Sequence, residues 1–190
     1  MKLNYQWPLP SQPRPIAIIG SGGIVKDAHL PAYQKAEFKV LGVYDINPEQ
    51  SAKIANSWNL KAFGSLDSLI SSAQSQNAVF DLALPPSAVS NVLEQLPEHA
   101  TVLIQKPMGS DLEEAKLIKA ICERKKLTAA VNFQLRFSPM MLALKDAMSK
   151  GHLERILDLE VHLNLEASWE LFPFLKKMER VEIAVHSIHY

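Results

Sequence analysis

The sequence has few of the residues that build disulfides, metal sites or nucleic-acid surfaces. Cys122 is the one cysteine in 190 residues, so the chain has neither an internal disulfide nor a multi-cysteine metal site. We interpret Cys122 as a buried, unreactive thiol and expect a reducing, cytoplasmic compartment. Lys and Arg total 20 and Asp and Glu total 20, so the charge balance does not favour binding to nucleic acid or to an anionic membrane. Small molecules are left as the expected partners, and no metal is expected.

Long apolar runs are also missing. No run approaches the ~18 residues of a membrane helix. The first fifteen residues hold four prolines and no continuous apolar core of the signal-peptide kind, so we expect an extended arm over residues 1–15. The 47% of hydrophobic residues is ample for a packed core.

A glycine turn, in the run IAIIGSGGIVKDAHLPAY from Ile16 to Tyr33, follows the first apolar strand. Gly20, Gly22 and Gly23 have no Cβ, so the backbone can turn tightly and approach a pyrophosphate, and the following helix offers unpaired N–H groups to the same anion. Val25 stands where the G-x-G-x-x-G/A fingerprint has its third small residue. A plain glycine turn between a strand and a helix is therefore the alternative to a dinucleotide-binding turn.

Strands then alternate with helices along the chain. The pattern predicts strands over 38–45, 61–63, 78–84, 101–105 and 127–133, and helices over 47–58, from 65, over 87–96 and over 110–125. We expect Asn47 and Ser110 to begin two of these helices, with Gln50 and Glu113 as their capping-box partners. This alternation is typical of an α/β domain with a doubly wound parallel sheet.

The pattern changes near residue 138. Residues 138–150 predict an amphipathic helix, 156–167 alternate like a strand with one wet face, and 180–190 predict a helix. One such strand is not stable alone. We therefore expect either a truncated reading frame or a strand that completes a sheet with another chain.

Polar residues stand at the predicted strand ends, where open α/β sheets bind ligands. Asp45 follows Gly20 by 25 positions and ends the second strand, where a carboxylate can accept hydrogen bonds from both ribose hydroxyls of an adenosine. It would repel a 2′-phosphate, which favours NAD over NADP. The alternative is an ordinary turn acid that caps the next helix.

Five motifs in order give the chain a family resemblance: IAIIGSGGI with HLPAY, then VYDINPE, LIQKPMGS, VNFQLRFSP and HSIHY. Their order and spacing resemble the Gfo/Idh/MocA oxidoreductases. The resemblance implies a Rossmann-like NAD(P)-binding domain over 16–137 and, over 138–190, the start of an α+β substrate and oligomerisation domain with an open, mainly antiparallel sheet. It also implies homo-oligomers for the full-length form.

The resemblance implies roles for residues at the last strand ends. Lys106 matches the lysine of the family's Glu-Lys-Pro motif, which contacts the substrate hydroxyl and the nicotinamide ribose, and Gln105 replaces the glutamate. Asn132 and Arg136 match an N-x-x-x-R-F run near the active-site floor and are candidate substrate residues. For Arg136, a structural role that ties the domains together is the alternative.

Two histidines near the end of the sequence complete the implied site. His189 matches the histidine that takes the hydroxyl proton, and imidazole can act as a base at neutral pH. Val185 stands where the family usually has an aspartate, with His186 beside it as a replacement for the polar role. A packed, hydrogen-bonded histidine is the alternative for His189. His29, in HLPAY, also recurs in the family, although packing explains it equally well.

The resemblance implies an NAD(P)-dependent oxidoreductase that transfers hydride between nicotinamide and a hydroxyl or carbonyl of a sugar, a polyol or a derivative. Lys106 and His189 are the expected catalytic residues. The residues expected to hold the cofactor, including the loop near the nicotinamide, are Gly20, Gly22, Gly23, Ile24, Asp45, Pro85, Pro86, Gln105 and Lys106. The alternatives are a catalytically silent NAD(P)-binding sensor or assembly subunit, favoured by Gln105 and Val185, and an inactive fragment.

Overall fold

The computed structural model describes residues 2–158, 160 and 162. The chain divides into two compact units. One comprises residues 9–132, and the other takes in residues 2–8 together with the described residues from 133 onwards. The predicted 180–190 helix lies outside the described residues, as do Val185, His186 and His189.

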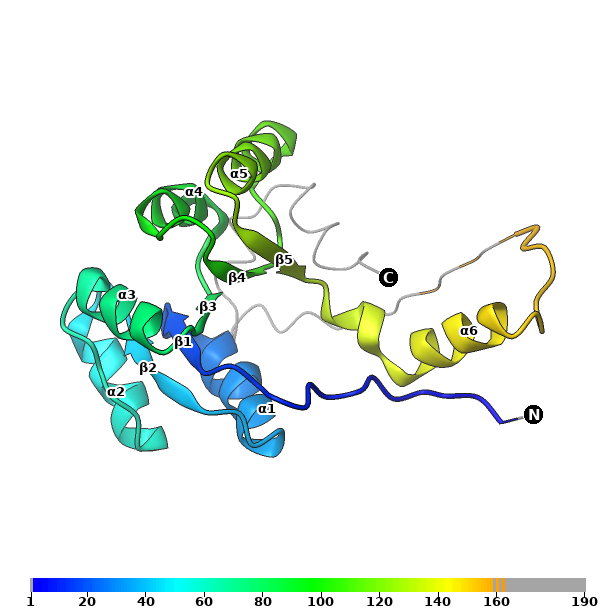
Figure 1. Ribbon diagram of the computed structural model, residues 1–190, viewed down its shortest axis with the longest axis horizontal. Helices are drawn as coiled ribbons and strands as arrows, with labels where there is room; N and C mark the ends of the chain where they lie inside the picture. Colours follow the sequence, from blue (N-terminus) through cyan, green and yellow to red (C-terminus); the bar gives the residue numbers. More distant parts are fainter. Residues whose placement is uncertain (1, 159, 161, 163–190) are drawn as a thin grey trace. The chain divides into compact units, whose positions relative to one another are not determined.

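The larger unit is built on a five-stranded parallel sheet (Figure 1). Its strands, in the order β2-β1-β3-β4-β5, are β1 (Ile16–Ile19), β2 (Val40–Tyr44), β3 (Val79–Leu82), β4 (Thr101–Gln105) and β5 (Thr128–Asn132). The predicted strand over 61–63 is reduced to one parallel bridge between Ala62 and Val43. Strand order reverses between β1 and β3, so the carboxyl ends of these strands frame a switch point.

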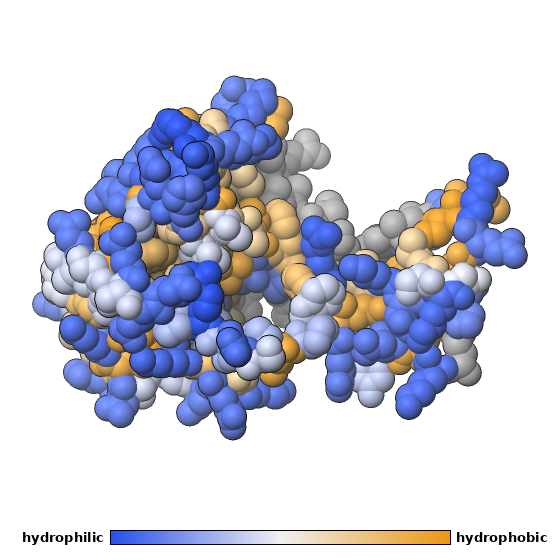
Figure 2. Space-filling model, viewed as in Figure 1, coloured by the Kyte–Doolittle hydropathy of each residue, from blue (hydrophilic) through white to orange (hydrophobic). Residues whose placement is uncertain are grey.

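Helices cover both faces of this sheet, which confirms the doubly wound α/β prediction. They are the helical segment η1 (Val25–His29) with α1 (Leu30–Lys35), then α2 (Pro48–Trp58), α3 (Leu66–Ser75), α4 (Pro86–Gln95) and α5 (Leu112–Arg124). Alternate residues of β1 enter different cores: Ile18 packs with α1 and α2, and Ile19 packs with α3, α4 and α5. Figure 2 shows hydrophilic residues over the outer faces of α4 and α5, as expected when their apolar faces cover the sheet.

Pro31 explains the form of the first helix. Proline has no backbone N–H, so the i to i−4 bond at that position is lost. The preceding turn of η1 is wound as a π-helix, with Leu30 N–H donating to Val25 O, and α1 begins with Pro31 in its first turn. The helical path continues through the proline and carries His29 and Tyr33 towards Asp81 on β3.

The predicted helix caps are correct at Asn47 and need correction at two other residues. Asn47 Oδ1 accepts hydrogen bonds from the N–H groups of the first turn of α2. Gln50 does not complete a capping box, because its amide donates to the Ser21 carbonyl at 3.1 Å. At α5 the cap is Asp111 and not Ser110, with Asp111 Oδ1 accepting from Glu114 N–H at 2.8 Å.

The smaller unit contains the 3-10 turn η2 (Gln134–Phe137) and helix α6 (Pro139–Ser149). Residues 2–8 run beside α6 (Figure 1), where Asn4 N–H donates to Asp146 Oδ2 at 2.8 Å and the Trp7 ring meets Phe137 edge-on at 5.2 Å. Of the strand predicted over 156–167, residues 156–158, 160 and 162 are described and have no regular secondary structure. No helix in the described part of the chain is long and apolar enough to cross a membrane.

Candidate functional site

The glycine turn lies at the switch point between β1 and β3. Gly20 N–H donates to Tyr44 O at 2.8 Å, and Gly20 has a φ of +98°. A Cβ on Gly20 would lie 2.3 Å from the carbonyl oxygen of Ala83, so this glycine is required for packing against the end of β3. A Cβ on Gly22 would meet no atom within 4 Å, and one on Gly23 would meet only Asp27 Oδ2 at 3.8 Å. The turn therefore has one glycine fixed by packing and two that border open space.

Asp45 ties this turn to the end of β2. Its Oδ2 accepts hydrogen bonds from both the backbone N–H and the hydroxyl of Ser21, each at 2.7 Å, and its Oδ1 accepts from Asn47 N–H at 2.9 Å. Gln50, on α2, donates to the carbonyl of the same Ser21. Asp45 thus belongs to the turn before α2, although Asn47 supplies the helix cap. Its carboxylate is partly exposed beside the glycine turn.

Gln105 and Lys106 leave the end of β4. Gln105 is buried, with 7% of its surface exposed, and its Oε1 accepts from the backbone N–H of Lys106 at 2.9 Å. Partial burial penalises the charged ammonium and lowers the pKa of Lys106 from its usual 10.5 to about 8. Asn132 is the register partner of Gln105 on β5, so it ends at the same edge.

A buried polar cluster behind this edge could not be predicted from the sequence. His29 Nδ1 lies 2.8 Å from Asp81 Oδ2, the Tyr33 hydroxyl donates to the same oxygen at 2.8 Å, and Gln105 Nε2 lies 3.3 Å from His29 Nε2. Burial and the Asp81 charge raise the pKa of Tyr33. Asp81 sits inside an apolar strand and 52 positions from His29. The only sequence signal for it was an acid in a run that was otherwise all apolar.

The remaining predicted site residues in the described part of the chain are Pro85, Pro86, Ile24 and Arg136. Pro85 and Pro86 stand at the start of α4, separated from the end of β3 by Ala83 and Leu84. Ile24 is 41% exposed at the turn, and Arg136 belongs to the smaller unit. Among the described residues, no group of three or more His, Cys, Asp or Glu side chains could hold a metal ion.

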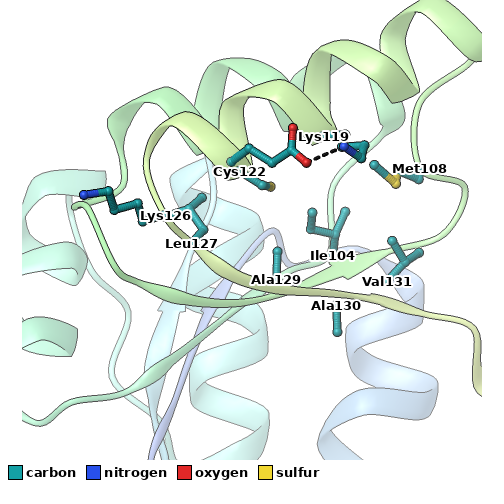
Figure 3. Close-up of a pocket in the computed structure, with 10 residues that line it drawn as sticks. Ile104, Met108, Lys119, Cys122, Lys126, Leu127, Ala129, Ala130 and Val131 are labelled. Atoms are coloured by element: carbon teal, nitrogen blue, oxygen red, sulfur yellow. Dashed lines mark hydrogen bonds and ion pairs between the residues drawn. The ribbon is translucent and has the colours of Figure 1, made fainter.

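A cavity of about 340 Å³ lies between α5 and the β4–β5 edge (Figure 3). Apolar side chains such as Ile104 and Val131 line it, and the ion pair of Lys119 with Glu123 stands beside it. Burial raises the pKa of the Cys122 thiol in its wall. None of the predicted site residues lines this cavity.

The model of the Gfo/Idh/MocA family, described as an oxidoreductase family with an NAD-binding Rossmann fold, matches residues 14–133. The chain belongs to this family. Glucose-6-phosphate 3-dehydrogenase of Bacillus subtilis is 31% identical over 150 residues, which are 77% of this chain and 41% of that protein. UDP-N-acetylglucosamine 3-dehydrogenase of Acidithiobacillus ferrooxidans is 28% identical over 132 residues, which are 66% of this chain and 40% of that protein.

Solved structures share the fold. A structure of the Acidithiobacillus ferrooxidans enzyme, GnnA, superposes with a TM-score of 0.59 and 26% identity over 70% of this chain and 42% of that one. The WlbA dehydrogenase of Bordetella pertussis, in complex with NADH and UDP-GlcNAcA, gives a TM-score of 0.58 and 22% identity over 76% of this chain and 44% of that one. The chain spans 40–42% of the length of the curated relatives it matches. The matched part is the family's NAD-binding Rossmann domain.

Proposed function

We propose that this chain is the nucleotide-binding part of an NAD-dependent dehydrogenase that acts on a hydroxyl of a sugar, a polyol or a derivative of one. The observation that carries the proposal is the open space at Gly22 and Gly23, beside the Asp45 carboxylate and on the same sheet edge as Lys106. Two relatives are named as 3-dehydrogenases of sugar derivatives, which supports this class of substrate.

The residues at the switch point fit a dinucleotide. The absence of any atom within 4 Å of a Cβ on Gly22 leaves room for a pyrophosphate against the backbone, and the first turn of the helix offers N–H groups to it. Asp45 would accept hydrogen bonds from the adenosine ribose while keeping its bonds to Ser21. Its negative charge favours NAD over NADP.

The chain's own residues would hold the proton chemistry. Bound nicotinamide supplies the group that accepts or donates hydride. Lys106 Nζ, with a pKa of about 8, is close enough to neutrality to donate a proton to a substrate oxygen or to take one back. Asn132 would contact the substrate from the neighbouring strand end. We assign the hydroxyl proton to His189, with His186 and Arg136 as further substrate contacts.

Calorimetric titration of the chain with NAD and with NADP tests this function. We expect NAD to bind and NADP to bind at least about tenfold more weakly, a difference near 1.4 kcal/mol. Asp45→Asn keeps an acceptor for the Ser21 N–H and removes the charge, so it should reduce the difference between the affinities for NAD and NADP. Absence of binding by either cofactor at millimolar concentrations would refute the proposal.

The second candidate is a silent NAD-binding sensor or assembly subunit, and Gln105 in place of an acid favours it. Lys106→Ala separates the two functions in the protein of full family length. An enzyme should lose turnover of a screened sugar by orders of magnitude while it keeps most of its NAD affinity, whereas a sensor has no turnover to lose. Reading the encoding DNA past Tyr190 tests the third possibility, an inactive fragment.

A further inference from the structure

A buried chain of hydrogen bonds joins the helix after the glycine turn to the loop that carries Lys106. It runs from Asp81 Oδ2 to His29 Nδ1 at 2.8 Å, from His29 Nε2 to Gln105 Nε2 at 3.3 Å, and from Gln105 Oε1 to Lys106 N–H at 2.9 Å. The His29 and Asp81 side chains are 6% and 1% exposed. We call these residues the His29 network. All of them lie in the larger unit.

The Lys106 end of the His29 network fixes the direction of every hydrogen bond in it. A backbone N–H only donates, so the atom of Gln105 that faces Lys106 must be the carbonyl oxygen Oε1. The amide NH₂ of Gln105 then faces His29 Nε2, and that nitrogen must accept. His29 consequently carries its proton on Nδ1, which donates to Asp81 Oδ2.

The reverse arrangement leaves donors facing donors. A proton on His29 Nε2 would point at the Gln105 NH₂ group. Turning the amide to relieve that contact would set the NH₂ group against the Lys106 N–H. In a site this buried, an unpaired donor is costly. Asp81 keeps two donors in the neutral state of His29, the imidazole Nδ1–H and the Tyr33 hydroxyl.

We propose that Gln105 is a positioning residue: it holds His29 neutral as the Nδ1–H tautomer and ties the Lys106 backbone to the helix that follows the glycine turn. The tie links the turn where the dinucleotide would lie to the lysine at the end of β4. The importance given to Lys106 rests on the proposed function. The bonds themselves are measurable without any cofactor.

Nitrogen-15 NMR of the whole chain at pH 7 tests the tautomer directly. We expect the His29 ring to show a protonated Nδ1 and an unprotonated Nε2. A proton on Nε2, alone or together with one on Nδ1, would overturn the proposal. The result does not depend on NAD, so a chain that fails to bind NAD but shows this tautomer refutes the proposed function and leaves the positioning role intact.

Gln105→Glu tests the charge-setting part. A carboxylate at this position accepts from both neighbours, so the Lys106 N–H stays bonded while His29 gains a second proton between two carboxylates. We expect both ring nitrogens to be protonated at pH 7 and the exchange of the Lys106 amide hydrogen to remain slow. An unchanged neutral His29 in this variant would contradict the proposal.

Gln105→Met tests the tie to Lys106. It removes both bonds of the side chain at similar volume, so the Lys106 amide should exchange at least about fivefold faster, as expected for the loss of about 1 kcal/mol. Gln95→Met makes the same chemical change on the exposed face of α4 and should leave that rate unaltered. Equal exchange in both variants would refute the tie. If Gln105→Met fails to fold, the nitrogen-15 spectrum of His29 in Gln105→Glu still tests whether Gln105 sets the protonation of that ring.

Discussion

Lys106 is the residue where burial and charge conflict most clearly. Its pKa is lowered to about 8, so between this value and 10.5 the unfolded chain binds more protons than the folded one. Burying the ammonium therefore costs stability below pH 8, and this cost disappears as the pH rises towards 10.5. The same property suits Lys106 to proton transfer near neutral pH.

We expect Lys106→Met to stabilise the chain at pH 7 by on the order of 1 kcal/mol, a figure reduced because the side chain is only partly buried. At pH 10 most of that gain should be absent. Urea unfolding at the two pH values measures it, with Lys53→Met on the exposed face of α2 as the control. A variant that is destabilised equally at both pH values would contradict this explanation.

Tyr33 contributes to the folded state through its bond to buried Asp81. The hydroxyl donates to Asp81 Oδ2 at 2.8 Å, and Asp81 Oδ1 has no hydrogen-bond partner among the described residues. Tyr33→Phe leaves the carboxylate with one donor, the His29 ring. We expect a loss of about 2 kcal/mol, because hydrogen bonds to charged groups contribute more than neutral ones.

Chemical unfolding of Tyr33→Phe and Tyr5→Phe measures this contribution. The Tyr5 side chain is 57% exposed, so its variant controls for loss of a phenol alone. The free energies of unfolding of the two variants should differ by most of the loss expected for Tyr33→Phe. Equal unfolding midpoints would mean that the bond to Asp81 adds nothing to stability.

Single residues also show where prediction from sequence stops. Gly20 and Asp45 were predicted at strand ends, because glycine and acidic residues at such positions have local signatures. The buried hydrogen bonds of Asp81 and the bond from Gln50 to the Ser21 carbonyl were not predicted, because each depends on a partner from a distant element. The apolar pattern predicts that the strand containing Asp81 is buried. It does not show which helix brings a histidine to Asp81.

At the scale of elements, the five strands of the sheet were predicted, whereas the strand expected over 61–63 is a single bridge and one helix cap was misplaced. β4 was predicted residue for residue, while β3 is shorter than the apolar run that indicated it. Strand length depends on the neighbouring strands, and these are not adjacent in sequence. Ser110 and Asp111 are both of the residue types that cap helices, and the sequence did not show that Asp111 is the one that accepts.

We expect Asp111→Ala to destabilise the chain by about 1 kcal/mol, the usual cost of losing an N-cap. The cost should appear globally, because α5 buries Ile118 and Ile121 against the sheet. Thermal unfolding compares this variant with Asp67→Ala, which removes an acid from the first turn of α3, where Ser65 is the cap. An effect no larger than that of Asp67→Ala would show that the Asp111 bond is not a stabilising cap.

At the scale of the whole molecule, sequence and structure agree on the Rossmann domain and its family. The strand–helix alternation and the first three family motifs, up to LIQKPMGS, lie in the part that matches, over residues 14–133, whereas VNFQLRFSP runs past its end and HSIHY lies beyond it. The predicted second domain has much less support. Its antiparallel sheet and the residues His186 and His189 stay predictions, because they rest on resemblance alone.

The central claim is that the glycine turn holds a dinucleotide, and one pair of glycines tests it. A Cβ meets no atom within 4 Å at either Gly22 or Gly64, so alanine at either position should leave the fold intact. Calorimetric titration with NAD compares both variants with the parent chain. We expect Gly22→Ala to bind NAD at least about tenfold more weakly and Gly64→Ala to bind it unchanged. Equal NAD affinity in all three proteins would contradict the account.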